Sequence, residues 1–225
     1  MFQGYSDATV DFLWGIRFNN DRAWFAEHKE EYLQHLYRPT QELGREVYDK
    51  FHEKYPKLPL ILHVSRIYRD ARRLHGRGPY KDHLWLSLQP EAGTASQLPA
   101  FWFEVAPEGW GYGMGFWNAT PTTMEAFRRE SAADPRELEK LARKLEQQDV
   151  FTLQGREYAR AKACPSALLQ PWFNKKSIII GCDRPWDDLV CSPDLVDALV
   201  EGFAFLEPYY SYCARFCRNG LEDLK

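Results

Sequence analysis

The chain has 225 residues, with 29 basic and 32 acidic side chains, a formal charge of −3, and 44% hydrophobic and 27% charged residues. These values are typical of globular proteins and exclude an intrinsically disordered chain. The length predicts one domain that buries its own core without a metal or a disulfide. The near-neutral charge argues against a basic surface over the whole domain, so nucleic-acid binding is not expected unless it is local.

No segment approaches the ~20 consecutive apolar residues of a membrane helix. The first residues lack the basic and apolar regions of a secretion signal. The five cysteines are an odd number and contain no Cys-x-x-Cys pair, which favours reduced thiols without a metal site. We therefore expect a cytoplasmic protein that contacts no membrane and carries no metal and no cofactor.

Residues 1–58 are predicted to be helical. Ser6 is a candidate N-cap for a first helix, and a second helix is expected after Asn19-Asn20. Pro39 is expected to end that second helix or to open the next one. The second helix has one face with residues at i, i+4 spacing, namely Trp24, His28, Tyr32 and Leu36.

Residues 60–118 are predicted to form a sheet with a basic loop. The stretch 60–68 is rich in branched residues, and residues 84–88 alternate between leucine and other side chains. Two further alternating runs, 101–105 and 110–116, are separated by Pro107-Glu108-Gly109. So short a connection between alternating runs is typical of an antiparallel hairpin.

Residues 120–225 are predicted to be mostly helical, with one strand near 176–181. Thr120-Pro121 and residues 134–137 resemble helix starts, and Ser192-Pro193 opens a long C-terminal helix that Pro208 is expected to bend. The whole pattern predicts an α+β fold in a single domain, with a mainly antiparallel sheet packed by N-terminal and C-terminal helices.

The chemically unusual segment is residues 66–81. It carries six basic side chains and one acidic one, although the chain as a whole is slightly acidic. Arginine forks match the paired oxygens of carboxylates and phosphates, and the glycines of this loop let backbone N–H groups approach an anion. The segment therefore needs negative partners, either from inside the protein or from a ligand. Its basic residues are Arg66, Arg69, Arg72, Arg73, Arg77 and Lys81.

Within this segment we expect an extended chain through Tyr68. That conformation places Arg66 and Asp70 on one side and Arg69 on the other. Asp70 and Tyr80 are the candidate polar or acid–base groups. Three histidines lie within or close to the segment, and one of them could transfer protons. They are His63, His75 and His83.

The predicted hairpin gives a second candidate site. Glycines at 111, 113 and 115 alternate with large residues, so one face of that strand has no side chains. A tight turn would pair Trp102 with Gly113 and Glu104 with Gly111. Trp102 either covers the bare face, which we favour, or borders with Glu104 a cleft whose floor is the glycine strand.

The sequence resembles a conserved domain-of-unknown-function family of bacterial proteins with fungal relatives, and the likeness covers nearly the whole chain. The resemblance implies one fold and one site around the basic segment, without an established activity. Two positions depart from the family pattern: Arg73 stands where the family has phenylalanine, and Gly76-Arg77 stands where it has a lysine. The matching N-terminal residues are Phe2, Gly4, Tyr5, Ser6, Asn19, Asn20, Trp24, Phe25, Lys29 and Tyr32. The matching hallmark residues are Arg66, Arg69, Asp70, Arg72, Pro79, Tyr80 and Lys81, with Trp117 and residues 189–208 also similar.

Three interpretations follow from these residues. The leading one is a protein that binds an anionic small molecule, such as a phosphorylated one, without a catalytic role assigned. The second is an interaction module whose basic loop docks on an acidic protein or a nucleic-acid backbone, and the third is a structural salt-bridge cluster with no ligand. The ligand-binding candidates are Arg66, Arg69, Arg72, Arg77, Lys81, Trp102 and Glu104.

Overall fold

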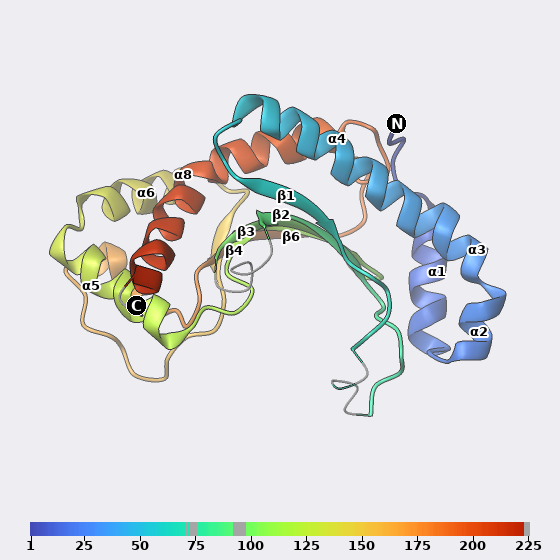
Figure 1. Ribbon diagram of the computed structural model, residues 1–225, viewed down its shortest axis with the longest axis horizontal. Coiled ribbons are helices and arrows are strands. Elements are labelled where there is room, and N and C mark those ends of the chain that lie inside the picture. The colour runs from blue at the N-terminus through green and yellow to red at the C-terminus, as the bar shows by residue number, and fades with distance from the viewer. Residues whose placement is uncertain (71, 73–75, 92–97, 223–225) are drawn as a thin grey trace. The chain divides into compact units, whose positions relative to one another are not determined.

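The computed structural model describes residues 1–70, 72, 76–91 and 98–222, and of residues 218–222 only the backbone. Arg73 and His75 of the basic segment lie outside these residues. The fold is α+β, as predicted, with an antiparallel sheet of six strands in the order β1-β2-β3-β4-β6-β5 (Figure 1). The chain divides into two compact units, of which the first comprises residues 1–88, 102–112 and 183–201 and the second the remaining described residues.

The N-terminal helices of the first unit follow one another with few connecting residues. They are α1 (Asp7–Phe18), α2 (Arg22–Glu27), α3 (Lys29–Glu31), the π-helix η1 (Tyr32–Tyr37) and α4 (Arg38–Lys54). The predicted start at Ser6 is confirmed, because Ser6 is the N-cap of α1.

The predicted second helix is interrupted at His28. The His28 ring stacks on Trp24 at 3.9 Å, and its Nδ1 lies 2.8 Å from the Trp24 carbonyl oxygen, which ends α2. Pro39 lies in the first turn of α4, as expected for a proline that opens a helix, although η1 runs directly into α4 without a connecting loop. A proline excludes a helical bond to the carbonyl four residues earlier. Here that carbonyl, on His35, accepts a hydrogen bond from the Thr9 hydroxyl at 2.7 Å.

The strands that form most of the sheet are β1 (Leu60–Val64), β2 (Leu84–Pro90), β3 (Ala100–Ala106) and β4 (Gly109–Gly115). Only two residues separate β3 from β4, which confirms the predicted hairpin. Alternate residues of β2 and β3 are fully buried. These are Leu84, Leu86, Leu88, Phe101, Phe103 and Val105.

Helix α4 covers the apolar face of β1 and β2 (Figure 1). A Cβ on Gly44 of α4 would lie 2.9 Å from Leu62 and 3.2 Å from Leu86, so these elements are in close contact. On the same face, Tyr5 stacks on Phe103 at 6.2 Å and shares a hydrogen bond with Thr40 of α4 at 2.8 Å. Because side chains alternate along a strand, the odd residues of β1 and β2 and the even residues of β3 lie on the opposite face.

The second unit contains α5 (Pro121–Ala133), α6 (Arg136–Glu146), β5 (Thr152–Gln154), η3 (Ala167–Leu169) and α7 (Gln170–Asn174). Strand β5 was not predicted, since three residues give no alternating pattern to detect. It pairs with β6 in an antiparallel arrangement.

Strand β6 (Ile179–Arg184) and helix α8 (Leu195–Glu222) each have residues in both units. The strand predicted near 176–181 was placed too early, because Lys176 and Ser177 precede β6 and only its apolar first half was recognised. The long C-terminal helix is confirmed, and α8 continues through Pro208. Across the described residues, no helix is both long and apolar enough to cross a membrane.

The glycines of β4 are needed because β6 lies close to them. The sequence had suggested instead that Trp102 covers the bare face of this strand or that Trp102 and Glu104 border a cleft. A Cβ on Gly113 would lie 2.2 Å from the carbonyl oxygen of Ile180, and one on Gly115 would lie 2.7 Å from that of Ile178. The backbone of β6 therefore approaches β4 too closely for any larger residue at these two positions.

Candidate functional site

The basic segment continues the β1–β2 pair as a narrow two-stranded extension, residues 65–69 and 79–83. Backbone hydrogen bonds run from Arg69 N to Pro79 O (2.8 Å) and from Lys81 N to Ile67 O (2.7 Å), and Tyr68 is paired with Tyr80. The chain predicted to be extended through Tyr68 is a regular strand only to Val64, bends at Ile67 and is bridged to the neighbouring segment at Tyr68. Figure 1 shows the extension running past α1 and α2.

Residues from the first two helices hold this extension. The side-chain amide of Asn20 donates to the Tyr80 carbonyl oxygen and its Oδ1 accepts from the Tyr80 N–H, both at 2.9 Å. The Phe25 ring stacks on the Tyr80 ring at 4.3 Å, and the Tyr68 ring lies 5.8 Å from Phe25. Asn20 and Phe25, which carried part of the family resemblance, thus have a visible structural role.

Arg69 finds its partners inside the protein. Its Nε donates to the Tyr80 carbonyl oxygen at 2.6 Å, and its Nη2 lies 3.6 Å from Oδ1 of Asp82. Asp82 also accepts a hydrogen bond from Nε of Arg17 at 2.7 Å. Burial raises the pKa of the Asp82 carboxyl, but the hydrogen bonds from Arg17 and His83 outweigh this effect, so the pKa is lowered. Arg69 therefore fastens the extension to α1 through a shared carboxylate.

Tyr80 is an anchor in this extension. Its side chain is only 4% exposed, and burial raises the pKa of its hydroxyl. A phenol that holds its proton this firmly is a poor general base near neutral pH.

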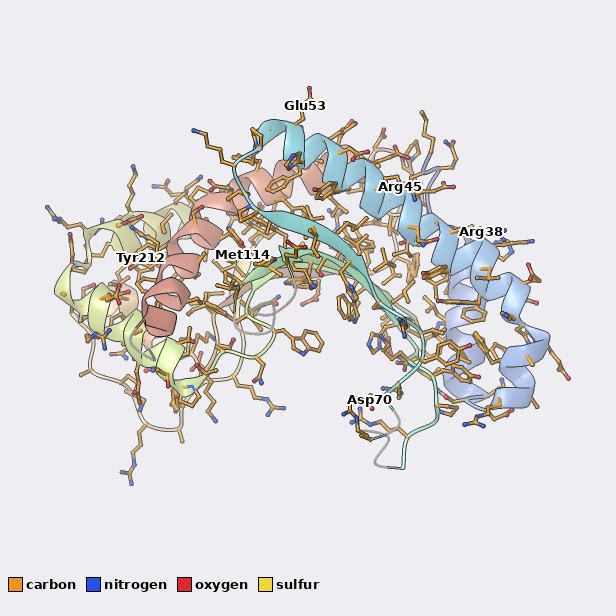
Figure 2. The ribbon with its side chains drawn as sticks, in the orientation of Figure 1. Arg38, Arg45, Glu53, Asp70, Met114 and Tyr212 are labelled. Carbon is orange, nitrogen blue, oxygen red and sulfur yellow. The ribbon has the colours of Figure 1, made fainter. Side chains whose placement is uncertain are left out.

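The outer part of the segment is exposed. Arg72 forms an ion pair with Asp70 of the same loop at 2.8 Å, and Figure 2 shows Asp70 at the end of the extension, far from Arg38 and Arg45 of α4. Arg66 and Arg77 are exposed, and neither forms an ion pair with any described residue. The described arginines of the segment consequently do not converge on one point.

A different group gathers on the face of the sheet turned away from α4. Its members are His63 on β1, Lys81 and His83 just before β2, Trp85 on β2, Trp102 and Glu104 on β3, and Asp183 on β6, which we call the polar face. The Lys81 ammonium lies 5.6 Å from the centre of the Trp85 ring, and the His63 and Trp85 rings are 5.2 Å apart.

Glu104 is the most perturbed acid of the polar face. Burial raises the pKa of its carboxyl, and the negative charges of Asp183 and Asp82 raise it further, while His83 and Lys81 oppose the change. Within the described part of the chain its carboxyl has no hydrogen bond and no ion pair. This carboxyl is thus biased toward its protonated form, in which it can donate a hydrogen bond.

Lys81 is perturbed in the complementary direction. Burial lowers the pKa of its ammonium, and the neighbouring charge of Arg69 lowers it further, while Glu104 opposes the change. Among the residues with described positions, none forms an ion pair with Lys81. Burial, followed by the charges of Lys81 and Arg66, also lowers the pKa of His63.

Sequence reasoning named Lys81, Trp102 and Glu104 but missed Asp82 and Asp183. Asp82 directly follows the Pro-Tyr-Lys run, so its position beside the hallmark residues was a usable signal. Asp183 offered none, because its approach to Glu104 depends on β6 joining the sheet after β4. The described residues contain no group of three or more potential ligands arranged to hold a metal ion.

One family model matches residues 8–212, and its description is "Conserved hypothetical protein (DUF2461)". The chain belongs to the DUF2461 family. A search of the curated proteins gives no significant match. The feature of this DUF2461 protein that indicates a chemical role is therefore the polar face. A half-buried ammonium can bind an anion through a charged contact, and a nearby carboxyl with a raised pKa can, when protonated, add a neutral hydrogen bond.

Proposed function

We propose that the protein binds a small anionic molecule on the polar face, with Lys81 as the charged contact. The observation that carries this proposal is the half-buried Lys81 ammonium, which has no ion pair among the described residues. Withdrawing a charge from water is costly unless an opposite charge replaces the lost solvation. A bound anion would supply that charge.

Neighbouring groups support an anion at this position. Arg66 adds a second positive charge that, like that of Lys81, lowers the pKa of His63. Protonated Glu104 would donate a hydrogen bond to an anion oxygen without adding a repelling charge. The indole of Trp102 would border the ligand from β3.

The remaining candidates of the basic segment take other roles in this proposal. Arg69 positions Lys81 through the extension, because its guanidinium is already bonded to the Tyr80 carbonyl oxygen. Arg72 and Asp70 form an ion pair with each other at the exposed end of the extension.

Titration with inorganic phosphate, followed by NMR and calorimetry, tests the proposal. Lys81→Met removes the charge but keeps an unbranched apolar stem against Trp85, and we expect it to weaken phosphate binding at least tenfold, about 1.4 kcal/mol. Arg72→Gln is the matched control with one positive charge fewer, and it should bind as the wild type does. Equal binding by Lys81→Met and wild type, with both folded, would refute the proposal.

The docking of the basic loop on an acidic partner is the second candidate. It is supported by the exposure of Arg72 and Arg77 at the end of the extension. Binding to an acidic polypeptide that weakens in Arg72→Gln and Arg77→Gln, and not in Lys81→Met, would favour it over the small-anion proposal. Such binding should also fall steeply with salt, since exposed charges are well screened.

A further inference from the structure

The second unit contains a cluster of positive charges around one aromatic ring. Arg128 of α5 lies 5.0 Å from the centre of the Tyr158 ring, Lys162 lies 4.4 Å from it, and Lys176 lies 5.5 Å from it. The three cations come from α5, from the stretch after β5 and from the stretch before β6. We call these four residues the Tyr158 cluster.

Hydrogen bonds hold the cluster in place. The Arg128 guanidinium donates to three backbone carbonyl oxygens, those of Phe173 (2.9 Å), Met124 (3.1 Å) and Lys175 (2.7 Å), which hold it in place without pairing its charge with a carboxylate. The Tyr158 N–H donates to the Asn174 carbonyl oxygen at 2.9 Å, and the Lys162 N–H donates to Oδ1 of the same Asn174 at 3.0 Å. The backbone that carries the cations is therefore fixed before any partner arrives.

The positive charge of this region is not neutralised internally. The run from residue 156 to 176 contains five basic residues and a single acidic one, Glu157, whose carboxylate is paired with Lys175 at 2.7 Å. The other cations of the region form no ion pair with any residue that the structure describes. They are Arg128, Arg156, Arg160, Lys162 and Lys176.

The side chains around these charges indicate what kind of partner fits. The exposed uncharged residues in this run are small, namely Ala159, Ala161, Ala163, Pro165 and Ala167, with Pro171 further along. Protein interfaces depend on buried aromatic or aliphatic anchors, and membrane surfaces recruit large apolar residues. None of the exposed residues of this run is large and apolar, and the half-buried Tyr158 ring already lies within 5.5 Å of three cations. A partner that carries closely and regularly spaced negative charges, and demands no apolar contact, is the phosphate backbone of a nucleic acid.

We propose that the Tyr158 cluster and the adjoining Arg156 and Arg160 form a docking surface for a nucleic-acid backbone, without base recognition. The proposal is independent of the anion site on the polar face. It agrees with the composition, because a chain of charge −3 excludes a domain-wide basic footprint but not a local one.

Fluorescence anisotropy with a labelled DNA duplex of mixed sequence tests this proposal over a series of salt concentrations. We compare the wild type with Lys162→Gln/Lys176→Gln, both exposed positions. Each phosphate contact contributes about 0.9 to the slope of log K against log salt. The double variant should therefore lose nearly two units of slope, and on the order of fiftyfold in affinity at about 0.1 M salt.

The control is Lys140→Gln/Arg143→Gln, which removes two exposed positive charges from α6 of the same unit. We expect this control to bind DNA as the wild type does. The proposal is overturned if the wild type fails to bind DNA at low salt, if Lys162→Gln/Lys176→Gln leaves the slope unchanged, or if the two double variants lose affinity equally. Polyglutamate that displaces DNA at equal charge concentration would assign the surface to an acidic protein instead and would equally overturn it.

Discussion

Replacing Asn20 with alanine tests how the extension that carries Lys81 is held. The two ladder hydrogen bonds of the extension join Arg69 to Pro79 and Lys81 to Ile67, so the N–H and C=O of Tyr80 point outward from the ladder. Asn20 meets both groups at 2.9 Å. The Tyr80 side chain is buried at this point, so a backbone N–H or C=O of Tyr80 without a hydrogen-bond partner would lower the stability of the fold.

The expected loss can be worked out group by group. The Tyr80 carbonyl oxygen keeps a partner in Asn20→Ala, because Nε of Arg69 still donates to it at 2.6 Å, so this end loses one hydrogen bond, about 1 kcal/mol. The Tyr80 N–H loses the acceptor that Asn20 provides, and an unsatisfied buried donor costs about 1–3 kcal/mol. We therefore expect the free energy of unfolding to fall by about 2–4 kcal/mol.

Urea denaturation followed by tryptophan fluorescence measures this loss. Asn19→Ala is the neighbouring control, since the exposed Asn19 side chain makes a single hydrogen bond, to the Gly15 carbonyl oxygen at 3.0 Å. That control should lose no more than about 1 kcal/mol. If Asn20→Ala lost no more than Asn19→Ala, the account of how the extension is held would be wrong.

Three further predictions concern the sheet and the loop. The raised pKa of Glu104 means that the folded protein keeps this proton to higher pH than the unfolded chain, so the free energy of unfolding should fall as pH rises through that window and then level off. The Glu104→Gln variant lacks this carboxyl and should not show the fall. Its free energy of unfolding, relative to that of the wild type, should therefore rise with pH until the wild-type carboxyl has ionised. A relative stability that does not depend on pH would contradict the assignment. Gly113→Ala should lower stability in urea by about 1–3 kcal/mol, because its Cβ would meet the Ile180 carbonyl oxygen at 2.2 Å, and a loss below about 0.5 kcal/mol would refute that close approach. Arg72→Gln should leave the thermal unfolding midpoint unchanged, since its ion pair with Asp70 is exposed, and a clear shift would show that the loop bears on stability.

Local patterns were sufficient for much of the fold. Alternation identified the buried faces of β2 and β3, the short Pro107-Glu108-Gly109 connection identified β4 as the hairpin partner of β3, and Ser6 and Thr120 identified two helix starts. These signals act between residues close in sequence, where side-chain period and capping chemistry are decisive. The strand near 176–181 was shifted and β5 was missed because neither carries a long alternating pattern.

The candidate site was harder to predict, because contacts between residues distant in sequence determine which of its charged groups have a partner and which have a shifted pKa. The sequence gathered the arginines of residues 66–81 into one cluster, yet Arg69 bonds the Tyr80 carbonyl oxygen and Arg72 bonds Asp70. Composition cannot separate a cation already satisfied by a backbone carbonyl from one that lacks a partner. Lys81 and Glu104 were both named from the sequence, but their opposite pKa shifts arise from burial and from strand order, which only the folded chain reveals.

The most direct measurement of the central claim is the titration of Glu104 by carbon-13 NMR, with and without inorganic phosphate. The account predicts a carboxyl pKa above the ordinary glutamate value of about 4.3, which rises further when phosphate binds beside Lys81. The further rise should disappear in Lys81→Met. An ordinary pKa that does not respond to phosphate would contradict an anion site on the polar face.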